Sequence, residues 1–157
     1  MNDRDYMSRV LAMERRLYRI AQAILWNDSD AADAIQTAVF KAWAKKGGLR
    51  EDRYFETWLV RILVNECRNI QRQKKALPLL EEILPGKDER MAEDMHLRMC
   101  LKRLDEKYRL PILLHHLEGY ALTEIAGILE IDSGLVKSRL YQGRRQLKKL
   151  LEEGETE

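Results

Sequence analysis

The sequence has few residues of the kinds that break helices or cross-link small folds: 3 prolines, 8 glycines and 2 cysteines among 157 residues. So little proline and glycine, with a hydrophobic content of 45%, excludes a disordered chain and favours a folded protein rich in helix. Cys67 and Cys100 each lie in a run of periodic apolar residues, without the CxxC spacing of a zinc or redox site. We therefore expect two buried structural thiols and a reducing compartment.

The chain also lacks a long apolar run and an excess of charge of one sign. No segment approaches the ~18 apolar residues of a membrane-spanning helix, and the first residues, MNDRDYMSRVLAMERR, lack the apolar core of a signal peptide. This predicts a soluble, cytoplasmic protein. With 28 Lys and Arg against 26 Asp and Glu, the net charge of +2 indicates no class of partner, so the local distribution of charge matters more.

What the sequence does contain is a series of apolar residues with a period near 3.6, which is typical of amphipathic helices. This spacing predicts helices over residues 5–26, 30–46, 55–75, 92–104 and 106–117, followed by a closely spaced pair within 122–149. No segment shows the period-2 alternation of a strand. The stretch ALPLLEEILPGKDER (76–90) holds two of the three prolines and indicates a linker with a short helical turn. We therefore predict an all-α protein of two small helical domains, 1–76 and 93–152, joined by a linker over 77–92.

The closely spaced pair of helices lies in the stretch LTEIAGILEIDSGLVKSRLYQGRRQLKK (122–149). Two helices separated by so short a break, with the small residue Ala126 where they must approach, indicate a helix-turn-helix. Asp132 and Ser133 are good N-cap residues for the second helix. The residues expected to face a shared core are Ile125, Leu129, Ile131, Val136 and Leu140.

The second helix of this pair carries the most uneven charge in the sequence. Between Lys137 and Lys149 there is no acidic residue, although the two signs balance over the whole chain. A basic run is commonly only a solvated face. This one directly follows a helix-turn geometry, however, and cations and amides on a second helix match entry into the major groove of DNA. The side chains expected to contact duplex DNA are Ser133, Lys137, Ser138, Arg139, Tyr141, Gln142, Arg144 and Arg145.

The predicted helix over 55–75 combines cations with aromatic residues near its start. Aromatic rings stack on unpaired bases while cations follow the phosphates, so this composition suits single-stranded nucleic acid. Two alternatives stay open: Trp58, at helical spacing from Ile62, also fits a core position, and Asn65 could face solvent or bond a carbonyl instead of reading a base edge. The candidate contacts are Tyr54, Trp58, Arg61, Asn65 and Arg68.

Two stretches of the chain resemble one known family. DAADAIQTAVFKAW (30–43), followed by FETWLVRILVNECRNIQRQKK (55–75), resembles the sigma-2 domain of extracytoplasmic-function (ECF) sigma factors. RLDEKYRLPILLHHLEGYALTEIAGILEIDSGLVKSRLYQGRRQLKKLL (103–151) is similar to their sigma-4 domain. The resemblance covers most of the chain, with both domains in the family's order. It implies an alternative sigma factor, a dissociable subunit that gives bacterial RNA polymerase its promoter specificity and is not itself an enzyme.

The resemblance also implies roles for individual residues. In the family, the helix matching 30–43 docks on the clamp of the largest polymerase subunit, and the matching polar residues are Asp30, Asp33 and Gln36. The residues that match the region melting and capturing the minus-ten element are Tyr54, Trp58, Arg61, Asn65 and Arg68. Those that match positions facing the minus-thirty-five element are Lys137, Ser138, Tyr141 and Gln142. Further partners implied by the family are the flap of the second-largest subunit and an anti-sigma factor, with no small-molecule substrate.

Several positions depart from the family's pattern, and the following three lie in or next to the helix-turn-helix. Glu130 stands in the turn where glycine is common, which predicts a left-handed residue at a cost of about 1 kcal/mol. Ala121 replaces a usual hydroxyl residue, which removes a side-chain cap from the first helix of the pair. Gly143 stands inside the second helix, where alanine is usual. These departures leave the promoter sequence unreadable.

The alternative interpretation is a stand-alone helix-turn-helix regulator, which accounts for residues 122–149 but not for the aromatic and basic helix over 55–75. A structural adaptor would show no salt-dependent affinity for DNA. An enzyme is not indicated, because no phosphate-binding loop, HExxH motif or nucleophile elbow is present. His115 and His116 are adjacent and point to different faces of a helix, and His96 has no evident partner, so we expect no metal and no cofactor.

Overall fold

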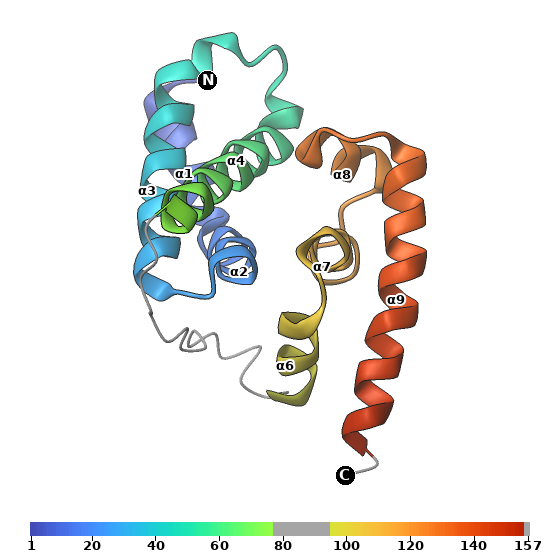
Figure 1. Cartoon of the computed structure of the whole chain (residues 1–157). Helices are drawn as coiled ribbons and strands as arrows, with labels where there is room; N and C mark the ends of the chain where they lie inside the picture. Colours follow the sequence, from blue (N-terminus) through green and yellow to red (C-terminus); the bar gives the residue numbers. More distant parts are fainter. Residues whose placement is uncertain (77–94, 156–157) are drawn as a thin grey trace. The chain divides into compact units, whose positions relative to one another are not determined.

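The computed structural model describes residues 1–76 and 95–155, and it divides the chain into two compact units, Met1–Gly86 and Lys87–Glu157. The described residues form helices and turns without a strand (Figure 1), so the prediction of an all-α protein with two helical domains is confirmed. The predicted linker over 77–92 lies outside the described residues, and the domain limits at 76 and 93 stay predictions. None of the described helices is both long and apolar enough to cross a membrane.

The first unit is built on three mutually packed helices, α2 (Glu14–Leu25), α3 (Asp28–Lys45) and α4 (Phe55–Ala76). The side of α3 that faces its neighbours is made of alanines, which let the helix axes approach closely. Ala31, Ala34, Ala38 and Ala42 are all buried. Short 3₁₀ turns, η1 (Lys46–Gly48) and η2 (Asp52–Tyr54), lead from α3 into α4.

The prediction of one helix over residues 5–26 is wrong, because the chain forms two helices there, α1 (Asp3–Ala12) and α2. The break lies at Met13, whose N–H bonds back to the carbonyl of Val10 at 3.0 Å, a tighter turn than the α-helix makes. The buried stripe continues through the break at intervals of three or four residues. Its members are Tyr6, Val10, Met13, Leu17, Ile20 and Ile24. Periodicity alone therefore cannot detect the break.

Helix α3 begins at Asp28, two residues before the predicted start. The side-chain oxygen of Asn27 accepts the backbone N–H of Asp30 at 2.9 Å, so Asn27 is the N-cap. Just before it, Trp26 ends α2 in the left-handed conformation (φ 53°) with its side chain buried. The predicted helix over 55–75 is confirmed, with α4 extending one residue further.

The second unit is assembled around one long helix, α9 (Ser133–Glu155), against which α6 (Met95–Arg103), α7 (Glu106–Ile112) and α8 (Leu122–Leu129) all pack. The predicted helix over 106–117 is confirmed in extent, but its last turn, η3 (Leu113–Leu117), is a π-helix. Pro111 has no N–H to donate and weakens the helical ladder just before this turn. Residues 92–94 of the predicted fourth helix lie outside the described part of the chain.

Gly143 lies where α9 packs closely against α7. A Cβ atom at this position would lie 2.9 Å from Cδ1 of Ile112, 3.1 Å from Cβ of Tyr108 and 3.3 Å from the Tyr108 carbonyl oxygen. The missing side chain therefore lets the two helices pack at this distance. Close packing against α7 therefore explains why this chain has glycine at position 143, where alanine is usual in the family.

Candidate nucleic-acid interfaces

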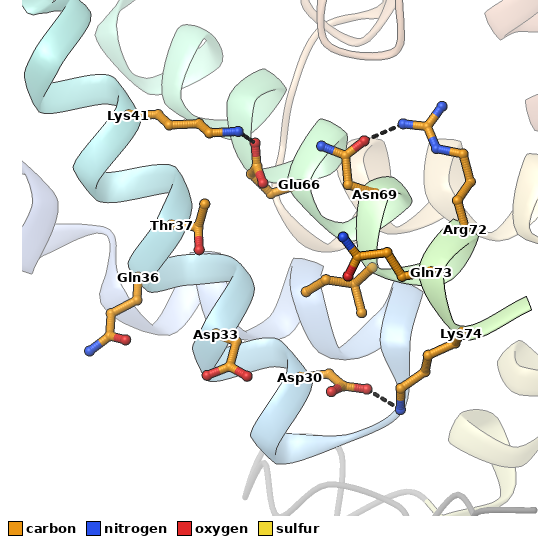
Figure 2. A pocket seen from close by; sticks show the side chains of 11 residues that line it. Asp30, Asp33, Gln36, Thr37, Lys41, Glu66, Asn69, Arg72, Gln73 and Lys74 are labelled. Atoms are coloured by element: carbon orange, nitrogen blue, oxygen red, sulfur yellow. Dashed lines mark hydrogen bonds and ion pairs between the residues drawn. The ribbon is translucent and has the colours of Figure 1, made fainter. Parts of the chain in front are cut away.

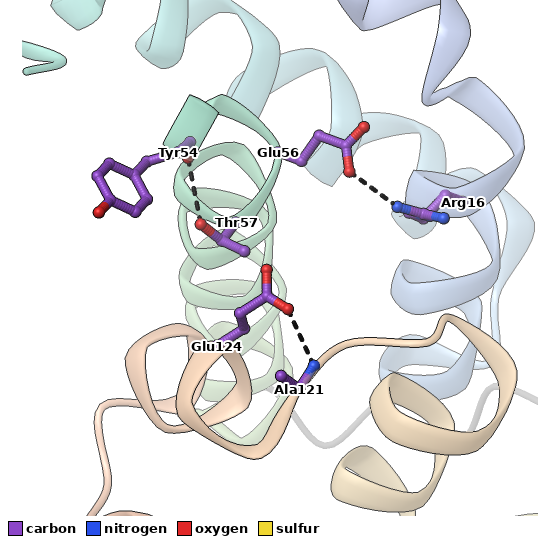
Figure 3. A network of polar contacts seen from close by, with 6 residues as sticks. All are labelled: Arg16, Tyr54, Glu56, Thr57, Ala121 and Glu124. Carbon is purple, nitrogen blue, oxygen red and sulfur yellow. Dashed lines mark hydrogen bonds and ion pairs between the residues drawn. The ribbon is translucent and has the colours of Figure 1, made fainter. Parts of the chain in front are cut away.

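The helix-turn-helix is held by three local devices at its turn and ends. Glu130 adopts the predicted left-handed conformation, with φ 56° and ψ 45°. Asp132 caps α9, since its Oδ2 accepts the N–H of Gly134 at 2.9 Å. Ala121 has no side-chain acceptor, but Glu124 Oε1 accepts the Ala121 N–H at 2.9 Å (Figure 3), which satisfies one backbone donor at the start of α8.

The exposed side of α9 carries the predicted duplex-contacting residues. Val136, Leu140 and Gly143 turn into the unit at intervals of three or four residues and are buried. Of the predicted contacts, only Arg139 is half-buried, and the exposed ones are Ser133, Lys137, Ser138, Tyr141, Gln142, Arg144 and Arg145. The structure therefore places the candidate residues of α9 outside its buried stripe, and all but Arg139 are exposed.

Some of these side chains are held in place by their neighbours on α9. The Arg145 guanidinium lies 5.7 Å from the centre of the Tyr141 ring, a cation–π contact that aligns both side chains. Arg144 Nε donates to the Leu140 carbonyl at 3.2 Å. Partial desolvation, His115 and the positive charge of Arg144 together lower the pKa of His116, so His116 lies within the electrostatic reach of this surface.

Helix α4 carries a second stripe that also faces away from its packed side. Trp58, Arg61, Asn65 and Arg68 follow one another at intervals of three or four residues, while Leu59, Leu63 and Cys67 form the buried side. Arg72 extends the stripe by one more turn and was not among the predicted contacts. Its spacing of four residues from Arg68 is the signal that could have added it.

The structure shows how Trp58 and Asn65, whose roles the sequence left open, are packed. Trp58 is half-buried, with its ring centre 6.2 Å from that of buried Phe55, so the ring packs against the core and stays partly accessible. Asn65 is also half-buried, and its amide makes no hydrogen bond to another residue within 1–76 or 95–155. The structure thus leaves the amide of Asn65 available for an external partner.

The start of α4 is anchored to the rest of the unit by polar contacts. Arg16 Nη1 on α2 pairs with Glu56 Oε2 at 3.1 Å, and the hydroxyl of Thr57 donates to the Tyr54 carbonyl at 3.2 Å (Figure 3). Tyr54 itself is 50% exposed, with the Arg53 guanidinium 4.7 Å from its ring centre. The aromatic ring that precedes the stripe is therefore accessible while its backbone is fixed.

A third candidate surface is the polar groove between α3 and α4, a cavity of about 820 Å³ (Figure 2). Its lining includes all three residues predicted to bind polymerase, Asp30, Asp33 and Gln36, together with residues of α4 that include Asn69, Gln73 and Lys74. We call this the α3/α4 groove. The sequence did not indicate the α4 side of it, because the two helices are brought together only by the fold.

Two ion pairs cross the α3/α4 groove. Lys74 pairs with Asp30 near the start of α3, and Lys41 pairs with Glu66 further along (Figure 2). Asp33 and Gln36 are exposed beside them. The acidic character expected from Asp30 is therefore partly neutralised within the chain, by a lysine whose part sequence reasoning missed.

The histidines and cysteines do not assemble a metal site. Within the described ranges, no three His, Cys, Asp or Glu side chains gather as metal ligands. His115 Nδ1 lies 2.9 Å from the Tyr120 carbonyl oxygen, and the His115 and His116 rings pack edge to face with centres 4.9 Å apart. Cys67 and Cys100 are both buried, as predicted, and form no disulfide.

Comparison with known families matches both halves of the chain. The family described as Sigma-70 region 2 matches residues 10–76, and Sigma-70, region 4 matches residues 94–147. These ranges contain the α4 stripe and the groove in the first case, and the helix-turn-helix in the second.

Curated relatives cover most of the chain. The ECF RNA polymerase sigma factor SigM of Mycobacterium tuberculosis is 33% identical over 141 residues, which is 87% of this chain and 72% of the relative. The ECF RNA polymerase sigma factor SigW of Bacillus subtilis is 30% identical over 155 residues, 87% of this chain and 83% of the relative.

Solved structures share the fold. The sigma factor RpoE of Bartonella quintana, solved with the anti-sigma factor NepR, gives a TM-score of 0.82 at 23% identity, over 94% of this chain and 97% of that one. CnrH, solved with the cytosolic domain of CnrY, gives a TM-score of 0.76 at 24% identity, over 96% of this chain and 90% of that one. With both regions present in order and relatives that match over most of their length, the chain belongs to the ECF sigma factors, the family that directs initiation of transcription by RNA polymerase.

Proposed function

We propose that this sigma factor reads duplex DNA of the minus-thirty-five element with α9, captures the separated minus-ten strand with α4, and binds core RNA polymerase through α3. The observation that carries the proposal is the charge of α9. From Ser133 to Leu151 the helix has six cations and no acid, although the whole chain is nearly neutral. A helix that follows a tight turn and exposes cations, an amide and hydroxyls is suited to the major groove.

The exposed side chains of α9 fall into two groups: those that position the helix on the DNA backbone and those that read the base sequence. Lys137, Arg144 and Arg145 reach phosphates or guanine edges, and their contribution does not depend on base order where they meet phosphate. Gln142 can bond adenine through its amide, and the exposed Tyr141 offers an apolar ring edge. Sequence preference at the minus-thirty-five element would therefore depend most on Gln142 and Tyr141.

The α4 stripe suits DNA whose strands have separated. Extruding a base from the stack costs a few kcal/mol unless a pocket receives it. Tyr54 and Trp58 offer ring surfaces, Asn65 offers both a donor and an acceptor, and Arg61 and Arg68 can follow the phosphates. Because Trp58 is backed by Phe55 and Asn65 by the helix, their arrangement precedes DNA binding.

Core polymerase would bind through Asp30, Asp33 and Gln36 on one wall of the α3/α4 groove, with basic residues of the largest-subunit clamp as counterparts. The second unit would dock on the flap of the second-largest subunit. Holding both units on one polymerase makes the second DNA contact intramolecular, so two weak surfaces act together. On this proposal the protein acts by binding alone, in the cytoplasm, without a cofactor or a catalytic group of its own.

An anti-sigma factor is a further proposed partner. The sigma factor RpoE of Bartonella quintana, which shares the fold, was solved with the anti-sigma factor NepR, and CnrH, which shares it too, was solved with the cytosolic domain of CnrY. We propose that such a protein covers the polymerase- and DNA-binding surfaces of this chain. A pull-down from the native cells that recovers polymerase subunits and no other stoichiometric partner would count against it.

The experiment that tests the proposed function is reconstitution with bacterial core polymerase. The purified chain should co-elute with core enzyme in the absence of DNA, and the holoenzyme should initiate at discrete start sites on a library of genomic fragments. A stand-alone helix-turn-helix regulator would bind duplex fragments but neither co-elute with core enzyme nor add start-site selectivity.

A further inference from the structure

The two ion pairs that cross the α3/α4 groove differ in how readily another cation could take the place of the lysine. Glu66 has only 11% of its side chain exposed and lies in the middle of α4, so without Lys41 its carboxylate would be buried and uncompensated. Asp30 is 18% exposed and lies in the first turn of α3, where the helix N-terminus also stabilises a negative charge. Asp30 can therefore exchange Lys74 for another cation more readily than Glu66 can exchange Lys41.

Lys74 is the side chain that would leave. It is 43% exposed, it lies two residues from the end of α4, and its ammonium reaches Asp30 across the groove on a flexible stem (Figure 2). Asp33 and Gln36 lie on the same wall of the groove and offer further acceptors for an incoming cation. The groove thus presents one acid that is occupied by an internal lysine and, beside it, acceptors that stay exposed.

We infer that the polymerase segment bound by this groove inserts a cationic side chain that displaces Lys74 from Asp30. The inference rests on the proposed docking of core polymerase at Asp30, Asp33 and Gln36. Lys74 occupies the position that the partner's cation takes in the complex, and its own positive charge repels that cation. Lys74 therefore lowers the affinity of the free chain for basic partners and selects those that can supply a well-placed Lys or Arg.

Removing this internal competitor should tighten the complex. Lys74→Gln keeps the length and polarity of the side chain but leaves Asp30 without its internal cation. Because half-exposed ion pairs are weak, we expect the Kd for core polymerase to fall about two- to fivefold. Lys75→Gln removes the same charge from the neighbouring exposed position, and we expect it to leave the Kd unchanged. Fluorescence anisotropy of labelled chain titrated with core polymerase measures both, with thermal melts verifying that the variants fold.

A double-mutant cycle identifies Asp30 as the partner of Lys74 in this effect. In an Asp30→Asn background, Lys74→Gln should no longer tighten binding, because there is no carboxylate to release. An unchanged or weakened affinity of Lys74→Gln alone, or equal tightening by Lys75→Gln, would overturn the displacement.

The docking proposal and the displacement fail in different ways. If Asp33→Asn and Asp30→Asn leave the Kd for core polymerase unchanged, the groove is not the docking site, and both the proposed docking and the displacement are wrong. If Asp33→Asn weakens binding while Lys74→Gln has no effect, docking is supported and the displacement alone is overturned.

Discussion

Helices α4 and α9 are nearly equal in length, 22 and 23 residues, yet they expose different chemistry. Helix α9 exposes cations, amides and hydroxyls, with an acid-free run from Ser133 to Leu151. Helix α4 packs against both α2 and α3 and mixes rings, an amide and cations along one stripe, with Glu56 and Glu66 held by Arg16 and Lys41.

This difference follows what each form of DNA offers a protein. In a duplex the bases are stacked, so a protein contacts only phosphates and the base edges in the grooves. A single charged helix can make both kinds of contact. A separated strand also exposes the faces of its bases, which rings and a firmly held amide can receive. A strand-binding surface must therefore be rigid, and α4 is the more enclosed of the two helices.

The largest effect is expected from disrupting the packing of α9 against α7, which leaves α4 unchanged. Gly143→Leu would force a side chain between α9 and α7, where a Cβ already lies 2.9 Å from Ile112, and should lower the free energy of unfolding of the second unit by about 3 kcal/mol. Hydrogen exchange should show reduced protection in α7 and α9 and no change in α2 to α4. The control is Gly127→Ala in α8, where a Cβ meets nothing within 4 Å, so stability should rise by up to about 1 kcal/mol.

A smaller effect should come from removing the amide of α4. Asn65→Ala should reduce open-complex formation by about 10- to 100-fold, since a base-reading amide contributes about 1–3 kcal/mol. Binding of a closed minus-thirty-five duplex should not change, because Asn65 lies on the other unit. Permanganate reactivity of promoter thymines measures opening, and normal reactivity in the variant would remove Asn65 from this role.

Single cations of α9 should have still smaller effects. Lys137→Ala or Arg144→Ala should weaken duplex binding by less than about tenfold. Each should also reduce the slope of log K against log salt by about 1 for every phosphate that the side chain no longer neutralises. Gln146→Ala, a neutral and exposed change on the same helix, is the matched control. Equally weakened binding by Gln146→Ala and Lys137→Ala would indicate that the helix, and not its charge, determines binding.

The smallest effect is expected at the turn. Glu130→Gly relieves a left-handed residue and should raise the free energy of unfolding by no more than about 1 kcal/mol. Because Glu130 is exposed and lies before the Asp132 cap, promoter affinity should stay the same. Urea titration measures the stability, and a lower stability of the variant would show that the Glu130 side chain contributes more than its strain costs.

The sequence predicts most of the helices because their apolar stripes repeat every three or four residues, as from Leu59 to Cys67 on α4. The same rule hides the break at Met13, where the stripe continues while the backbone does not. It also gives no sign of the π-helix at Leu113–Leu117, which depends on hydrogen bonding and not on which residues are apolar.

The candidate surfaces are predictable to different degrees for a similar reason. The α9 residues are neighbours in sequence, so spacing alone gathers Lys137, Tyr141 and Arg144 on one side. The α3/α4 groove joins residues far apart in the chain, and nothing near Asp30 in the sequence indicates that Lys74 lies opposite. The role of Gly143 is likewise set by Tyr108 and Ile112 on another helix.

The most direct test of the comparison is to measure holoenzyme binding to two separate probes, a duplex carrying the minus-thirty-five element and a single strand carrying the minus-ten element. We predict that Lys137→Ala and Arg144→Ala weaken binding to the duplex alone, while Trp58→Ala and Asn65→Ala weaken binding to the single strand alone. If the α9 variants fail to bind the single strand, or the α4 variants fail to bind the duplex, the division of labour between the two helices is wrong.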